Sequence, residues 1–203
     1  MPLILRTLAV CLLLACSVGF GRAADEGSPV ALQTGQHLAG QFEHERRIAG
    51  FDVPLRSSGS MLLTRGGELI WRTEQPFVSQ MVVTPNTIMQ IVDGRHAMQI
   101  PTGAAGQVNE LLVRVLTGDW AGLGFRQTGG PGSWSALGEG ASLPEILAAQ
   151  ISEIRARGGR FVDEVTVTRK NGDVERFRFH DHAIRQDPLP EGDRALLERS
   201  QGG

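Results

Sequence analysis

The most constraining feature of the sequence is a series of short apolar–polar alternations between Phe42 and Ile100. Alternation with a period of two is typical of strands that bury one face of a sheet. Turn-forming residues separate the alternating runs, so neighbouring strands can pair through short connections. We therefore predict a six-stranded antiparallel meander, with strands at Phe42–Ile48, Gly59–Arg65, Leu69–Thr73, Val78–Thr84, Thr87–Val92 and His96–Ile100.

Beyond Ile100 the apolar period changes to that of a helix. An amphipathic helix cannot bury its apolar stripe alone, so this helix is expected to cover the apolar face of the sheet. Gly118 is well placed to end it. The residues of the stripe recur every three or four positions: Val108, Leu111, Leu112, Val115 and Leu116.

A second helix is predicted after a glycine-rich stretch that is expected to form a loop. The sequence Ser142-Leu143-Pro144-Glu145 matches a capping box, which is typical of a helix N-terminus. Gly158-Gly159 would end this helix. Its apolar stripe would consist of Leu143, Leu147, Ile151 and Ile154.

A final hairpin is predicted from two alternating runs, Phe161–Arg169 and Val174–Phe179, on either side of Asn171-Gly172. The apolar faces of the two runs meet only if the loop has an odd number of residues, which indicates a bulge. We expect such a loop to pair Val165 with Phe179 and Val167 with Phe177. The polar residues after position 187 are expected to fray.

Residues 1–23 are predicted to be a signal peptide that is removed from the mature protein. Arg6 supplies a positive n-region, an uncharged apolar run follows, and Gly21-Arg22-Ala23 places small residues before the expected cleavage point. The mature chain, residues 24–203, is then expected to be a single domain. An alternative stays open, because the residues that end at Cys16 resemble a lipobox, in which Cys16 would be retained and acylated.

The charge and the motifs of the chain exclude several function classes. Lys and Arg number 20 and Asp and Glu number 22, so no basic arm for nucleic acid is present. The sequence contains no nucleophile elbow, no phosphate-binding loop and no dinucleotide fingerprint. His180-Asp181-His182 is the nearest approach to a metal motif, and two histidines do not make a site. We expect no catalytic residues, no metal and no cofactor; a hydrolase or metalloenzyme using His180 and His182 is the enzymatic alternative.

The predicted inner face of the sheet combines flexible and slim apolar side chains. Methionine adapts to irregular apolar surfaces, so such a face could line a lipid pocket as well as form an ordinary core. Together with two aromatic residues, this face gives the candidate cavity residues Phe42, Met61, Leu63, Leu69, Trp71, Met81, Val83, Met89, Ile91 and Met98.

The stretch from Phe42 to Gly94 resembles the LolA-type periplasmic carriers of outer-membrane lipoproteins. A strand opened by Ser58-Gly59, an arginine six residues before Trp71, and a proline five residues after it make a fairly specific combination. The residues that carry the resemblance are Pro54-Leu55-Arg56-Ser57-Ser58-Gly59-Ser60-Met61-Leu62-Leu63-Thr64-Arg65, Leu69-Ile70-Trp71-Arg72-Thr73-Glu74-Gln75-Pro76-Phe77, Met81-Val82-Val83-Thr84 and Ile88-Met89-Gln90-Ile91-Val92-Asp93-Gly94.

The resemblance implies a mainly β (α+β) fold, an incomplete antiparallel β-barrel with helices covering its mouth. It further implies a periplasmic carrier that holds acyl chains of a lipoprotein or lipid in an apolar cavity, without covalent chemistry. An inner-membrane exporter and an outer-membrane receptor would be its partners, and we expect a monomer that binds no nucleic acid. The lid arginine of the family, which hydrogen-bonds to the covering helices, falls on Arg65.

The sequence departs from the family pattern at three places, one of which is the Leu143–Arg157 segment, whose pattern is more helical than the family implies there. Phe42-Glu43-His44 stands where the family has Phe-x-Gln, and Gly66 stands where a proline usually follows the lid arginine. These departures favour a divergent branch, in which the cargo could be a glycolipid or a polyene rather than a general lipoprotein. An anchored LolB-like outer-membrane receptor with an acylated Cys16 is the other alternative.

Overall fold

The computed structural model describes residues 30–92, 94–101, 104–130, 132–140, 143 and 145–201. Its elements, in chain order, are β1 (His37–Arg47), β2 (Leu55–Thr64), β3 (Leu69–Gln75), β4 (Ser79–Val83), β5 (Thr87–Val92), β6 (Arg95–Pro101), α1 (Ala104–Thr117), β7 (Arg126–Gly130), β8 (Ser133–Glu139), α2 (Glu145–Ala148), β9 (Ile151–Gly158), β10 (Val162–Arg169), β11 (Val174–Arg185) and α3 (Glu191–Gln201).

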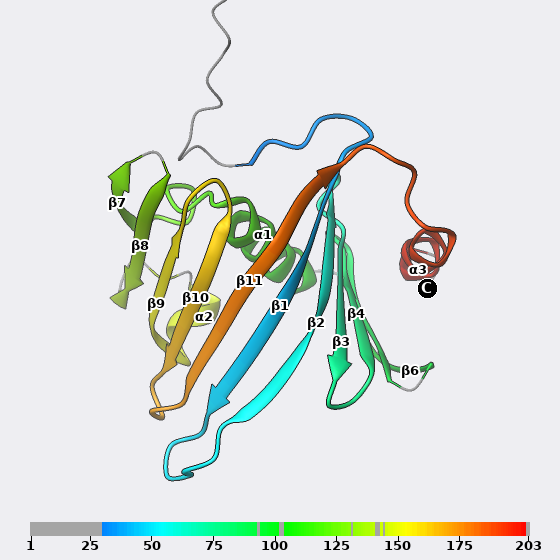
Figure 1. Ribbon diagram of the computed structural model, residues 1–203. Coiled ribbons are helices and arrows are strands. Elements are labelled where there is room, and N and C mark those ends of the chain that lie inside the picture. The colour runs from blue at the N-terminus through cyan, green and yellow to red at the C-terminus, as the bar shows by residue number, and fades with distance from the viewer. Residues whose placement is uncertain are drawn as a thin grey trace, which may run out of the picture.

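The strands of the described chain form one 11-stranded antiparallel sheet, in the order β6-β5-β4-β3-β2-β1-β11-β10-β9-β8-β7. The first six strands pair consecutively, which confirms the predicted meander. The sheet stays open and curves around α1, so the fold is the expected incomplete barrel (Figure 1). The N-terminal and C-terminal hairpins of the chain join where β1 pairs with β11.

Helix α1 lies on the concave side of the sheet, as its apolar stripe predicts (Figure 1). Two of its own residues, Ala105 and Leu116, are fully or almost fully buried. Gly118 adopts a φ of 79° directly after the helix, a left-handed conformation that glycine adopts without a steric penalty. The predicted end of this helix is therefore confirmed.

The predicted second helix is wrong over most of its length. Only one turn, α2, forms, and the chain from Ile151 onward is the strand β9. Within β9 the inward residues Ile154, Ala156 and Gly158 alternate with outward charged residues. Alanine and glycine contribute little to an apolar pattern, so the strand period was concealed and the spacing of isoleucines resembled a helical stripe.

The glycine-rich stretch contains the strands β7 and β8 instead of the predicted loop. Close neighbours require a glycine at two strand positions, one in β8 and one in β9. A Cβ atom at Gly138 would collide with the ring of Phe125, and one at Gly158 would collide with Phe161 O and lie 2.8 Å from the ring of Trp134. These residues are strand glycines that accommodate a close neighbour.

The C-terminal residues form the helix α3 rather than a frayed tail. Leu196 and Leu197 of α3 are buried against Ile70, Val82 and Met89 on the convex side of the sheet. The molecule therefore has two apolar clusters, one on each face of strands β2–β5. The polar composition around the leucine pair concealed this helix at the sequence level.

The C-terminal hairpin has the predicted odd loop but a different register. Arg169 N donates to Asp173 O, which leaves a three-residue loop with Gly172 at a φ of 89°. Val165 pairs with Phe177, and Val167 pairs with Glu175. The observed register differs from the expected one by two residues. A shift of two keeps each side chain on the same face of the sheet.

Within the described residues, no helix is both long and apolar enough to cross a membrane. The predicted signal peptide, residues 1–23, lies outside the described residues.

Candidate functional site

The site is built on the concave face of the sheet, where consecutive strands align apolar side chains in rows. Met61 pairs with Trp71, and Trp71 pairs with Met81. The next row contains Leu63, Leu69, Val83 and Ile88. Cross-strand neighbours of this kind lie about 5 Å apart, so the rows form a continuous apolar wall beneath α1.

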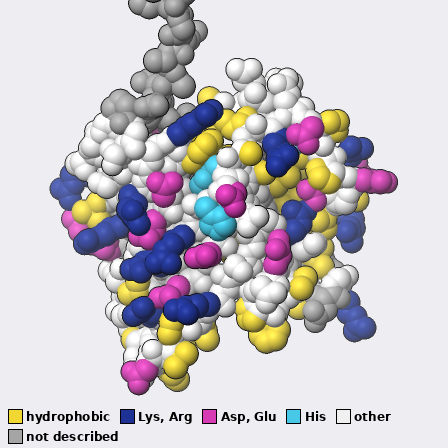
Figure 2. Space-filling model, viewed as in Figure 1, with side chains coloured by type: hydrophobic (Ala, Val, Ile, Leu, Met, Phe, Trp, Pro, Cys, Tyr) yellow, Lys and Arg dark blue, Asp and Glu magenta, His cyan; other side chains and the backbone are white. Residues whose placement is uncertain are grey.

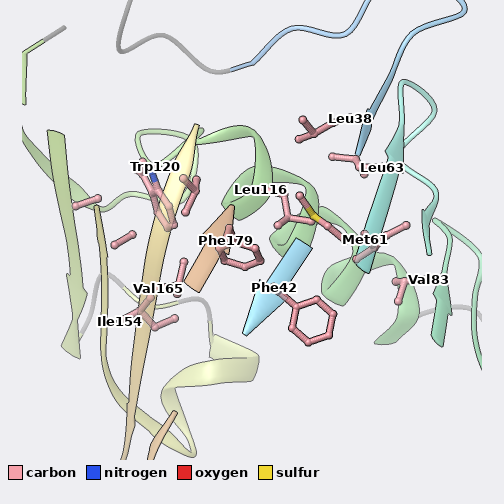
Figure 3. Close-up of a cluster of buried hydrophobic side chains, with 14 of the residues drawn as sticks. Leu38, Phe42, Met61, Leu63, Val83, Leu116, Trp120, Ile154, Val165 and Phe179 are labelled. Atoms are coloured by element: carbon pink, nitrogen blue, oxygen red, sulfur yellow. The ribbon is translucent and has the colours of Figure 1, made fainter. Parts of the chain in front are cut away.

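Most of the predicted cavity residues lie in this wall. Phe42, Met61, Leu63, Leu69 and Val83 are buried in the concave cluster, and Trp71 and Met81 pack partly buried against it. Figure 3 shows part of this cluster, with Leu116 and Met61 facing each other and Phe179 beside them. Met98 lies in β6, where the side chains fall outside the described part of the structure.

The prediction that Met89 and Ile91 share this face is wrong. Both lie in the convex cluster beneath α3, because Met89 pairs with Val82, which faces away from α1. The inward residues of β5 are Ile88 and Gln90 instead. Strand β5 is apolar on both sides, so the alternation alone does not identify its inner face.

A cavity of about 140 Å³ lies between α1 and strands β9–β11. The wall of this inner cavity is entirely apolar and includes only one predicted site residue, Trp71. Helix α1 supplies four leucine and valine side chains, and the hairpin β10–β11 supplies four more residues. The lining residues are Trp71, Leu111, Leu112, Val115, Leu116, Leu147, Ile151, Ile154, Val165, Val167, Phe177 and Phe179.

Stacked aromatic rings form one side of the inner cavity. The rings of Phe42 and Trp71 stack with centroids 3.9 Å apart, and Trp71 meets Phe177 and Phe179 edge to face at 6.0 and 6.1 Å. Such edge-to-face contacts favour a defined geometry. The aromatic group fixes the shape of this side, whereas the aliphatic residues of α1 form the opposite side.

A polar cluster borders the inner cavity at the end where β1 finishes and β11 begins. The ring of His44 stacks on Phe177 with centroids 4.2 Å apart, and its Nε2 lies 3.4 Å from Glu175 Oε2. Arg169 Nε donates to Glu175 Oε1 at 2.7 Å. Nearby, Arg46 donates to the buried Asp173 at 2.8 Å. The concave face therefore changes from apolar to charged along β11.

These contacts stabilise the charged forms of the acids. The neighbouring His44 and the hydrogen bond from Arg169 lower the pKa of Glu175 to about 2, although burial opposes the shift. The Arg46 guanidinium and the backbone N–H of Ala49 lower the pKa of Asp173 below its usual value. At neutral pH both ion pairs of the cluster, Arg169–Glu175 and Arg46–Asp173, are therefore charged.

Asn109 connects α1 to the sheet. Its side chain is buried, and its Nδ2 donates to Gly67 O at 2.6 Å and to Val83 O at 3.5 Å. The helix also approaches the β4–β5 turn closely, because a Cβ atom at Gly106 would lie 3.2 Å from Pro85 O. These contacts fix the N-terminal half of α1 over the wall.

Arg65, the predicted lid residue, lies in the exposed turn between β2 and β3. It makes no hydrogen bond or ion pair with any other residue in the described ranges. The bond from the helix to this turn comes instead from Asn109 to Gly67, two residues further along the chain. The role of Arg65 as a lid residue stays a prediction.

The histidines at the end of β11 do not converge on a shared site. His180 Nδ1 pairs with the exposed Asp181 at 3.0 Å, whereas His182 stacks on Phe161 with centroids 4.8 Å apart. Burial lowers the pKa of His182 below its usual value. Among the described residues, no group of three or more His, Cys, Asp or Glu side chains could hold a metal ion.

Sequence reasoning missed the residues of the inner cavity that come from the second half of the chain. The signals were present: the helical stripe ending at Leu116 and the apolar face of the final hairpin both point into it. The polar cluster had no signal, because His44 is far in the sequence from Arg169 and Glu175 and meets them only through the β1–β11 pairing.

Comparison with known proteins finds likeness in structure but none in sequence. No family model matches the sequence, and no curated protein matches it. A LolA superfamily protein from Nitrosomonas europaea resembles the structure with a TM-score of 0.37 and 9% sequence identity, over 80% of this chain and 91% of that one.

Proposed function

We propose that the protein is a periplasmic carrier that holds the acyl chains of a lipoprotein or lipid between α1 and the concave face of the sheet. The observation that carries the proposal is the inner cavity, which is entirely apolar and is bordered by a polar cluster at one end. An amphiphile matches this arrangement, because its acyl chain meets the apolar wall while its polar group meets His44 and Glu175. The resemblance of the stretch from Phe42 to Gly94 to LolA-type carriers supports the same function.

The inner cavity in its observed form is too small for a long acyl chain. A volume of about 140 Å³ is close to that of engineered apolar cavities that bind benzene. Loading therefore requires α1 to move away from the wall. The exposure of apolar wall opposes this movement, and burial of the acyl chain offsets it by about 0.8 kcal/mol for each methylene group.

The cargo would be delivered by transfer to a partner with a better-fitting site. Helix α1 and the acyl chain compete for contact with the same apolar wall. Tighter packing of α1 on the wall therefore weakens cargo binding and favours release. An inner-membrane exporter and an outer-membrane receptor would be the donor and the acceptor. A glycolipid or polyene carrier, and an anchored receptor with an acylated Cys16, are the alternatives that the sequence leaves open.

Substitution of Val167 by phenylalanine tests the proposal directly. The larger ring would occupy the inner cavity, and we expect the affinity for a fluorescent long-chain fatty acid to fall by about tenfold or more, equivalent to about 1.4 kcal/mol. Thr168→Phe is the matched control, because Thr168 is the next residue of β10 and is absent from the cavity wall. Equal binding by the parent and by Val167→Phe would contradict the proposed location of the cargo.

Native mass spectrometry of protein purified from the periplasm, with lipid extraction, identifies the cargo. Bound acylated peptides would support a lipoprotein carrier, whereas glycolipids or polyenes would support the divergent branch. The N-terminal mass separates a soluble protein starting at Ala24 from a lipidated form starting at Cys16. Absence of any acylated species and of fatty-acid binding would contradict a carrier role.

A further inference from the structure

The convex face of the sheet carries arginine residues in a regular arrangement that the carrier function does not use. One cross-strand row runs over seven strands, from β7 to β2, and has arginine on every second strand. In strand order this first row is Arg126, Leu137, Arg155, Thr166, Arg176, Glu45 and Arg56.

A second row lies beside the first on the same face. In strand order it is Thr128, Ser135, Arg157, Glu164, Arg178, Glu43 and Ser58. The two rows, which we call the arginine face, contain twice as many arginine as glutamate residues. Glu139 and Glu153 lie beside the rows and pair with Arg126 and Arg155, which brings the face to six arginine and five glutamate residues. The face is therefore slightly positive, whereas the chain as a whole has a formal net charge of -2.

The arginine face is grooved. One groove of about 440 Å³ lies over β7–β10 and is lined by Arg126, Arg155 and Arg157 together with hydroxyl side chains. A second groove of about 430 Å³ lies over β11, β1 and β2, where Arg56, Arg176 and Arg178 alternate with Glu43 and Glu45. Figure 2, which views this face, shows dark-blue arginine side chains with magenta acids between them over these strands.

Arg155 and Arg157 are accessible to a partner, because their side chains lie largely in solvent although each is paired with a glutamate. Arg155 pairs with Glu153 at 2.7 Å, and Arg157 pairs with Glu164 at 3.2 Å, in both cases with the guanidinium largely in solvent. Exposed ion pairs contribute little stability and exchange partners readily. Arg176, in the middle of the first row, has a buried Nε atom without a hydrogen-bond partner in the described part of the chain.

The spacing of the first row selects the shape of the partner. Neighbouring strands lie about 4.8 Å apart, so arginines on every second strand are about 9.6 Å apart. Three residues of a polyproline II segment span about 9.3 Å, and such a segment projects every third side chain in the same direction. The full row, about 29 Å long, corresponds to roughly nine residues of such a chain.

We propose that the arginine face docks an extended acidic polypeptide segment that carries Asp or Glu at every third residue. Each carboxylate would accept two hydrogen bonds from the planar fork of one guanidinium. A segment of this kind enters the grooves, whereas a flat anionic bilayer contacts only the tips of the arginines. This inference does not depend on the proposed carrier function.

Fluorescence anisotropy with synthetic peptides tests the inference on the purified protein. The probe is a labelled 12-residue peptide, of about the length of the row, with glutamate at every third position. We expect the probe to bind, and a peptide of the same composition with its glutamates clustered at one end to bind about tenfold more weakly. Equal affinities for the two peptides, or no binding of either at low salt, would overturn the proposal.

Charge-reversal variants locate the binding. Arg155→Glu and Arg176→Glu should each weaken binding of the periodic peptide by about tenfold, because one charge-assisted pair is lost and one repulsion is added. Arg199→Glu, on the exposed side of α3, is the matched control and should leave the affinity unchanged. Sensitivity of all three variants alike would overturn the proposed location.

Vesicles of phosphatidylglycerol, with phosphatidylcholine vesicles as the reference, distinguish the membrane from the polypeptide. Cosedimentation with the anionic vesicles that is abolished by Arg176→Glu, without any preference for the periodic peptide, would assign the face to an anionic membrane and overturn the proposal. Fatty-acid binding by Arg176→Glu, measured in parallel, should match the parent, so failure of the docking proposal is distinguishable from failure of the carrier proposal.

Discussion

Glu175 shows how a single residue connects the apolar site to the rest of the molecule. It lies opposite Arg46 in the β1–β11 pairing and opposite Val167 in the β10–β11 pairing, directly beside the end of the inner cavity. His44 and Arg169 stabilise its charge although only 12% of its side chain is exposed. A carboxylate in such surroundings is stable only while its partners stay in place.

The depressed pKa of Glu175 predicts a defined acid sensitivity. Because the folded-state pKa is about 2 and the ordinary value is 4.5, its contribution to stability is complete above pH 4.5 and is lost as the pH falls toward 2. The shift corresponds to about 3 kcal/mol of unfolding free energy. We expect Glu175→Gln to lower stability at pH 7 and to flatten this part of the pH profile, measured by urea denaturation between about pH 7 and pH 2.

A control separates this effect from general charge loss. Glu110 pairs with Arg114 on the exposed surface of α1, with 65% of its side chain in solvent. Glu110→Gln should therefore retain the acid sensitivity of the parent. If the parent and Glu175→Gln lose the same free energy between pH 4.5 and 2, the assignment of the acid sensitivity to Glu175 is wrong.

At the scale of elements, the sequence predicts those structures whose pattern involves large apolar residues. The meander β1–β6 and the helix α1 were predictable because their alternation and their stripe consist of leucine, valine, isoleucine and methionine. Strand β9 was not, because its inward residues shrink from Ile154 to Ala156 and Gly158. The glycine at position 158 is required by the Phe161 backbone and the Trp134 ring, which leave no room for a Cβ atom, and no local pattern encodes this tertiary contact.

The same limit applies to the candidate site. The apolar wall of β2–β4 was predictable from alternation, and the assignment failed at β5, where Ile88 and Met89 are both buried on opposite faces. The choice between them depends on the register with β4, which sets Met89 opposite Val82. Neither this register nor the meeting of His44 with Glu175 is encoded in any local pattern.

Helix α1 forms one side of the inner cavity, and Asn109 attaches it to the sheet with two hydrogen bonds. Asn109→Ala removes two hydrogen bonds and leaves the carbonyl oxygens of Gly67 and Val83 buried without that donor. We expect it to destabilise the fold by about 1–3 kcal/mol. We also expect faster hydrogen exchange across α1 and faster uptake of a fluorescent fatty acid, because the helix detaches more easily.

A variant on the opposite face distinguishes loosening of α1 from loss of stability. Leu196→Ala creates a cavity beneath α3 and should destabilise the fold by about 2–5 kcal/mol. Because Leu196 does not touch the concave cluster, uptake should stay at the rate of the parent. Equal acceleration by Leu196→Ala and Asn109→Ala would show that uptake follows global stability rather than the attachment of α1.

At the scale of the whole molecule, large apolar side chains are exposed to solvent at one end of the sheet, where their exposure is energetically unfavourable. Phe51 and Phe77 are 71% and 80% exposed, and Val53, Leu55 and Val78 are also largely in solvent. Leu55 is the first residue of β2, and the others lie in the loops β1–β2 and β3–β4, which are at the same end of the antiparallel sheet (Figure 1). Exposed apolar clusters of this kind mark interaction sites.

These loops lie at the same end as the polar cluster, since β1 finishes and β11 begins there. An acyl chain that enters past His44 and Glu175 therefore comes from the side on which Phe51 and Phe77 project. A carrier that extracts acyl chains from a membrane needs contact with the bilayer interface, and aromatic rings partition there favourably. The apolar loops would supply that contact.

The double substitution Phe51→Ser and Phe77→Ser tests whether the apolar loops contact the bilayer during uptake of an acyl chain. Both rings are exposed, so the unfolding free energy should change by less than about 0.5 kcal/mol for each, and binding of dispersed fatty acid should match the parent. Uptake of the same fatty acid from phospholipid vesicles should slow by about tenfold, because the encounter with the bilayer loses two apolar contacts. Leu137→Ser, on the convex face, is the control and should leave both the binding of dispersed fatty acid and the rate of uptake from vesicles unchanged. Uptake from vesicles at the parental rate by the double variant would show that cargo enters without these loops.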